Sequence, residues 1–76
     1  MAEVTIEYCV PCDFLERAET IQHQLLKQFG ERIESAALVT GDKGVLRVHV
    51  DGNVVWDKDD DEYDLDEITR RVREHV

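Results

Sequence analysis

The stretch that decides the fold is residues 4–12, which read Val4-Thr5-Ile6-Glu7-Tyr8-Cys9-Val10-Pro11-Cys12. Its first half alternates apolar and polar side chains, which is the period of a β-strand. Its second half holds Cys9 and Cys12, the only two cysteines of the chain. Two thiols three residues apart at a strand-to-helix turn can close a disulfide with little backbone movement. A C-x-x-C pair near a βαβ pattern therefore predicts a redox-active pair of cysteines.

An amphipathic helix is expected after the cysteines. Its apolar stripe consists of Phe14, Ala18, Ile21, Leu25 and Phe29, widened by Leu15 and Leu26. Asp13, with Glu16 three residues later, resembles a capping box, and Gly30 supplies the left-handed residue that ends helices. The spacing leaves the start open between Cys9 and Asp13, since a proline such as Pro11 is tolerated in a first turn. The amides at the start of this helix favour a thiolate at the cysteines.

The rest of the chain predicts three strands and a second helix. The strands cover Ile33–Val39, Val45–Val50 and Asn53–Asp57, and Asp51-Gly52 forms the hairpin turn between the last two. The acidic residues 57–62 predict a solvated loop. The final helix has a capping-box pattern at its start and one apolar face, formed by Leu65, Ile68, Val72 and Val76 after the cap residues Asp64 and Glu67.

The element order is therefore β-α-β-β-β-α, in one domain that covers residues 1–76. The first crossover should be right-handed, which makes the first two strands parallel. The last two strands should form an antiparallel hairpin. We expect an α/β fold in which a four-stranded mixed sheet carries both helices packed on one face.

The charge balance excludes several classes of partner. The net charge is −9, from 18 acidic and 9 basic residues. Nucleic acids and anionic membrane surfaces require a basic face, so neither is expected as a partner. No long apolar run or signal peptide is present, and we expect a soluble, cytoplasmic protein. The acid excess with only three lysines indicates a halophilic surface; a melting temperature that stays flat from low to molar salt would contradict this hypothesis.

The chain resembles the Rdx family, which comprises relatives of selenoproteins W, T and H and their cysteine-containing prokaryotic homologues. The resemblance rests on an ordered set of motifs that covers almost the whole chain: residues 4–12, Phe29-Gly30, residues 44–48, Val50-Asp51-Gly52-Asn53-Val54-Val55-Trp56 and Arg70-Arg71-Val72. It implies a thioredoxin-like fold and thiol redox chemistry without a bound cofactor. Pro11 is the only proline, so the cis-proline that faces the cysteines of thioredoxins is absent.

Both cysteines are interpreted as catalytic, because disulfide exchange needs an attacking thiolate and a resolving thiol within reach. By the logic of thioredoxins, Cys9 attacks, since it is expected to be the more exposed of the two. The selenoprotein relatives indicate the opposite, because their selenocysteine takes the position of Cys12. The charge of Asp13 should oppose a thiolate at Cys12, and no histidine is close in sequence.

Two other functions are compatible with the same residues. One is a redox-sensitive binding module in which the oxidation state of Cys9 and Cys12 changes a partner surface without turnover. The other is a zinc module, although zinc normally takes four ligands and no pair among His23, His49 and His75 has the usual spacing. We predict no metal or cofactor, and a protein thiol or disulfide, or a small thiol, as partner. A monomer or a weak dimer through a strand edge is expected.

Overall fold

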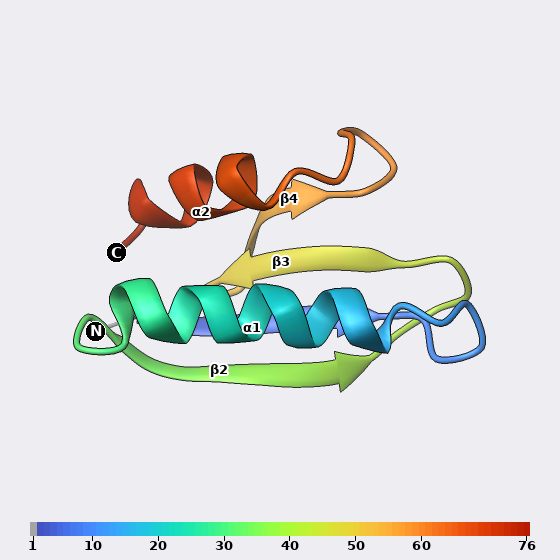
Figure 1. Ribbon diagram of the computed structural model, residues 1–76, viewed down its shortest axis with the longest axis horizontal. Coiled ribbons are helices and arrows are strands. Elements are labelled where there is room, and N and C mark those ends of the chain that lie inside the picture. Colours follow the sequence, from blue (N-terminus) through green and yellow to red (C-terminus); the bar gives the residue numbers. More distant parts are fainter. Residues whose placement is uncertain (1) are drawn as a thin grey trace.

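The computed structural model describes residues 2–76 and has six elements in the predicted order (Figure 1). The strands are β1 (Ala2–Tyr8), β2 (Ile33–Thr40), β3 (Leu46–Val50) and β4 (Asn53–Asp57). The helices are α1 (Leu15–Phe29) and α2 (Leu65–Arg73). The sheet order is β2-β1-β3-β4, with β1 and β2 parallel and the other neighbours antiparallel. The predicted four-stranded mixed sheet is confirmed.

Both helices cover the same face of the sheet. In Figure 1, α1 lies over β1 and β2, while α2 lies beside β4 and contacts α1. The strands send alternate side chains into a single apolar core, which also takes the buried stripes of the helices. Its most deeply buried members are Val4, Ile6, Ile21, Leu25, Leu46, Val48, Val50, Trp56, Ile68 and Val72. Among residues 2–76, no helix covers the opposite face of the sheet. No helix in residues 2–76 is long and apolar enough to cross a membrane.

The β3–β4 hairpin forms as predicted. Asp51 and Gly52 have φ angles of 52° and 84°, and two successive positive values define the type I′ turn that matches the twist of antiparallel strands. The turn is also tied to β1, because the Asp51 amide donates to the Glu3 carbonyl and the Glu3 amide donates to Asp51 Oδ1, both over 2.9 Å. These bonds hold the hairpin in register with the centre of the sheet.

Both predictions about the ends of α1 are wrong. Asp13 is not its cap: it has a φ of 61°, and its amide donates to the Val10 carbonyl to close the turn around the cysteines. The helix instead begins at Leu15, and its N-cap is Phe14, which makes no side-chain capping hydrogen bond. Gly30 is right-handed, with a φ of −54°. The Arg32 amide donates to the Phe29 carbonyl, and this hydrogen bond closes a tight turn around Gly30. No left-handed residue is therefore needed there.

One half of the capping box predicted for α2 is confirmed. Asp64 Oδ1 accepts hydrogen bonds from the amides of Asp66 and Glu67, over 3.0 and 3.3 Å. The Glu67 carboxylate does not reach back to the cap, because it accepts bonds from Arg70 and Arg71 one turn further on. Those two guanidinium groups lower the pKa of Glu67 to about 2.

This pKa predicts a specific acid sensitivity. Because the folded pKa lies below the ordinary value of 4.5, the ionised Glu67 stabilises the fold above pH 4.5, and this contribution is lost as the pH falls toward 2. Urea unfolding at low salt should therefore show a larger loss between pH 5 and pH 2.5 for the wild type than for Glu67→Gln. Equal losses in the two proteins would contradict the assignment.

Candidate functional site

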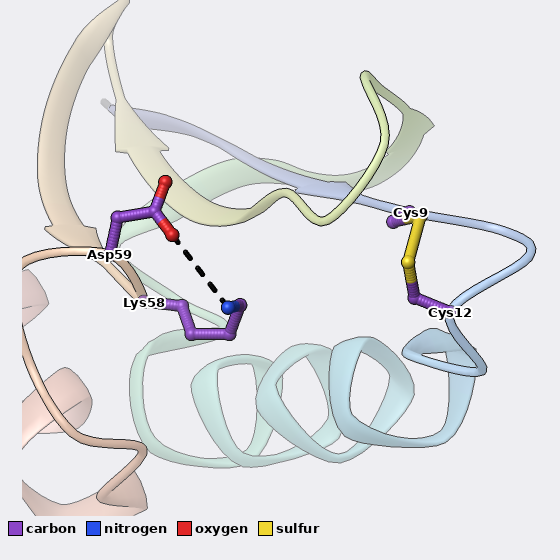
Figure 2. The surroundings of a disulfide bond; sticks show 4 residues. All are labelled: Cys9, Cys12, Lys58 and Asp59. Atoms are coloured by element: carbon purple, nitrogen blue, oxygen red, sulfur yellow. Dashed lines mark ion pairs between the residues drawn. A yellow bond between two sulfur atoms is a disulfide. The ribbon is translucent and has the colours of Figure 1, made fainter.

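The two cysteines lie in the turn that joins β1 to α1, at the end of the molecule opposite both termini (Figure 1). The Cys9 amide donates to the Val45 carbonyl over 2.9 Å, so the pairing of β1 with the β3 side continues to Cys9. The chain then folds back, and the Cα atoms of Cys9 and Cys12 lie 5.4 Å apart. Their sulfur atoms are joined as a disulfide (Figure 2). The sequence thus folds locally so that the two thiols meet.

The two sulfurs differ in their access to solvent, in the opposite sense to the prediction. Cys9 is 0% exposed, whereas Cys12 is half-buried. The expectation that Cys9 is the more exposed is therefore wrong. The physical reason is that Cys9 is still hydrogen-bonded to the sheet through Val45, while Cys12 lies beyond the turn at the molecular surface. Cys12 is therefore the more accessible of the two residues.

The side chains next to Cys12 form an apolar rim. Val10 is 56% exposed, and both Pro11 and Leu15 are exposed beside it. Exposed apolar side chains that gather at one place mark a surface for contact with another molecule. The turn therefore presents its accessible sulfur within a small apolar surface.

Two cationic side chains lie near the ring of Phe14, which follows Cys12 and Asp13 at the start of α1. The Lys58 ammonium lies 5.5 Å from the centre of this ring, and the Arg17 guanidinium lies 5.7 Å from it. Lys58 comes from the loop after β4 and forms an ion pair of 3.7 Å with Asp59; Figure 2 shows both residues in the surroundings of the disulfide but well apart from the two sulfurs. Sequence reasoning missed Lys58, because only the β3–β4 pairing brings this distant loop to the start of α1.

The start of α1 also bears on the thiols. No side chain caps the helix at Phe14, so the first-turn amides keep their partial positive charge toward the preceding turn. This field favours a thiolate, whereas the carboxylates of Asp13 and Glu16 oppose it. The opposing signs predict a modest rather than an extreme activation of Cys12.

The other residues considered from the sequence do not join the cysteines. His49 lies on the helix-free face of the sheet, 3.3 Å from Glu7, which also pairs with Arg47. Arg47 bonds to Asp57 on the same face over 2.9 Å. Although burial raises it, hydrogen bonds from the Asp59 amide and from Arg47 hold the pKa of Asp57 below its ordinary value. Residues 2–76 contain no group of three or more His, Cys, Asp or Glu side chains that could hold a metal ion.

The chain has clear relatives. Residues 3–74 match the family model described as the Rdx family. The chain belongs to the Rdx family. The resemblance stated from the ordered motifs is thereby confirmed.

Two solved structures support the Rdx fold. A protein from Bordetella parapertussis, known from its crystal structure, is 35% identical to this chain. The match covers 99% of this chain and 98% of the Bordetella chain, with a TM-score of 0.91. The crystal structure of a selenoprotein W-related protein from Vibrio cholerae is 26% identical, with coverage of 97% and 95% and a TM-score of 0.88. No curated protein matches the chain. The Rdx family points to a redox-related role.

Proposed function

We propose that this Rdx protein is a thiol–disulfide redox protein that uses Cys9 and Cys12 and needs no bound cofactor. The observation that carries the proposal is the asymmetric pair, with two sulfurs in bonding contact, one buried and one half-buried. A pair of this kind can form and break a disulfide without moving the sheet or the helices. We expect it to work in a reducing cytoplasm, where a lone C-x-x-C pair serves a redox function more often than a structural one.

The exchange reaction starts from the reduced pair. The Cys12 thiolate attacks one sulfur of a partner disulfide, and the other partner sulfur leaves as a thiolate that takes a proton from water. Cys9 then loses its proton to solvent, and its thiolate attacks Cys12 Sγ. This second step forms the Cys9–Cys12 disulfide and releases the remaining partner sulfur as a thiolate. Two electrons have passed from the pair to the partner, and the reverse sequence oxidises a partner dithiol.

We assign the attack to Cys12 and the resolving step to Cys9. A buried sulfur cannot reach a partner, but it can reach the neighbouring sulfur once a mixed disulfide has formed. The exposure of the two side chains therefore favours the order that the selenoprotein relatives indicate. It disfavours the order of thioredoxins, in which the first cysteine attacks.

The surroundings of Cys12 favour a protein segment as the partner over a small thiol. Val10, Pro11 and Leu15 offer apolar contact area on either side of the sulfur, and a small charged thiol would leave most of this area uncovered. The same rim also supports the second candidate, a redox-sensitive binding module. In that case the oxidation state would change partner affinity, with no catalysed exchange.

The decisive experiment is the reduction potential of the Cys9–Cys12 pair. The protein is equilibrated in graded dithiol buffers at molar salt, free thiols are alkylated, and the mass is read. A reversible two-electron transition near the cytosolic poise, about −220 to −320 mV, is expected. A pair that never oxidises, or that resists alkylation until zinc is removed, would overturn the proposal. A reversible pair that fails to accelerate reduction of a protein disulfide would favour the binding module.

A further inference from the structure

The two edges of the sheet are protected to different degrees. The β4 edge belongs to a five-residue strand with an irregular register opposite Val48 and His49. The Arg71 guanidinium from α2 also donates to its Val55 carbonyl over 3.4 Å. The β2 edge belongs to a strand of eight residues, whose pairing with β1 is irregular at its start, where Glu34 is an extra residue, and regular from Ser35 to Thr40. An unprotected edge of this length can pair with another strand.

The hydrogen-bond pattern shows which groups of β2 point outward. Tyr8 directs its carbonyl to β2, since it accepts from the Gly41 amide. Gly41 and the other odd-numbered residues of this segment therefore face β1, because main-chain groups alternate along a strand. In the regular part of the strand, the even-numbered residues turn their amides and carbonyls outward, and they are Ala36, Leu38 and Thr40.

Gln22 confirms this direction and guards one position. Its Nε2 donates to the Ala36 carbonyl over 2.7 Å, from α1 above the edge. In residues 2–76, this is the one side chain that the structure shows bonded to the outward row. The stretch from Ser35 to Thr40 holds no charge and no proline, which are the usual means of protecting an edge.

Apolar side chains border the same edge in both layers. Val39 is 43% exposed on the helix-free face of the sheet. Leu26 is 44% exposed on α1, one turn after Gln22 and so on the same side of the helix. A strand added at this edge would cover both residues.

We infer that β2 pairs antiparallel with β2 of a second copy of this chain. The occupant must be an extended, uncharged segment with free main-chain groups, and β2 itself has this chemistry. A two-fold axis through Ala37 places Ala36 opposite Leu38 of the second copy, and Ser35 opposite its Val39, within the regular part of the strand. No like charges face each other directly in this register, which satisfies the requirement for cross-strand pairs.

The dimer is weak and depends on salt. Each copy carries a net charge of −9, and this repulsion is screened only at high ionic strength. The Gln22 side chain must also give up its bond to the Ala36 carbonyl before that carbonyl can pair. The two-fold axis places the two turns between β1 and α1 at opposite ends of the joined sheet, so both Cys12 side chains stay accessible to solvent. The inference is therefore independent of the proposed redox function.

The test uses Ala37, which is exposed and would meet its own counterpart at the axis. Light scattering and sedimentation at molar salt should show a dimer for the wild type. Ala37→Asp and Ala37→Lys should each weaken it by roughly twofold to fivefold, since like charges then face each other. An equimolar mixture of the two variants should restore a dimer that contains one copy of each.

Two further variants complete the design. Val54→Asp adds the same charge on the same face of the sheet, but on β4, and should leave the dimer unchanged. Gln22→Ala should strengthen it, because the Ala36 carbonyl is released. Far-UV circular dichroism verifies that each variant is folded. A wild type that stays monomeric at molar salt, or a mixture of Ala37→Asp and Ala37→Lys that does not associate, overturns the inference. Binding of an extended peptide at β2 by a monomeric wild type overturns the choice of occupant.

Discussion

The Cys9→Ser variant should be trapped as a stable mixed disulfide with a partner, and the Cys12→Ser variant should not. Each substitution abolishes the internal disulfide, because only one thiol remains. They differ in which sulfur is left: Cys12 is half-buried within the apolar rim, whereas Cys9 is 0% exposed. At equal pH, the thiol of Cys9→Ser should react with iodoacetamide at least about tenfold faster than that of Cys12→Ser, because access to solvent favours Cys12.

The comparison has its control built in. Both variants carry the same chemical change and the same net charge, so a general effect of losing the disulfide appears equally in both. Repeating the alkylation in urea should remove the difference, since unfolding exposes both thiols alike. Faster alkylation of the Cys12→Ser variant in the folded state would restore Cys9 as the attacking thiol. Catalysed exchange by either single variant would refute the two-thiol mechanism.

The Trp56→Ala variant should lose about 3–5 kcal/mol of its free energy of unfolding, the usual cost of removing a large aromatic side chain from a core. Trp56 is the largest fully buried side chain and lies on β4, edge-on to Tyr63 at a ring separation of 6.2 Å. Small domains are stable by about 5–15 kcal/mol, so this loss removes a large part of the total. Urea unfolding at molar salt, followed by far-UV circular dichroism, measures it without the tryptophan signal.

The Trp56→Phe variant is the matched comparison. The indole Nε1 is buried and has no hydrogen-bond partner within the described residues. An unpaired buried donor costs about 1–3 kcal/mol, and phenylalanine removes that cost while it keeps most of the apolar contact. Trp56→Phe should therefore be much closer to the wild type than Trp56→Ala. Equal losses of the free energy of unfolding in the two variants would contradict this prediction.

Much of this fold follows from local patterns. The alternation in β1, the helical stripe from Ala18 to Phe29 and the Asp51-Gly52 turn predicted their elements within a few residues. The two errors at the ends of α1 share one cause. Asp13 and Gly30 each match a helix-end signal, but a hydrogen bond of the adjacent turn sets the backbone at each position. The Asp13 amide donates to the Val10 carbonyl, and the Arg32 amide donates to the Phe29 carbonyl.

The sequence by itself determined the order of elements, the mixed sheet, the family and the pair of cysteines that meet in the turn between β1 and α1. These depend on residue periods and on spacings of a few positions, which a linear chain displays directly. Only the tertiary structure decided which sulfur faces solvent, because the burial of Cys9 depends on its bond to Val45 across the sheet. The same holds for Lys58 beside Phe14 and for the open edge of β2. Each results from segments far apart in the chain, and their contacts form only when the sheet is assembled.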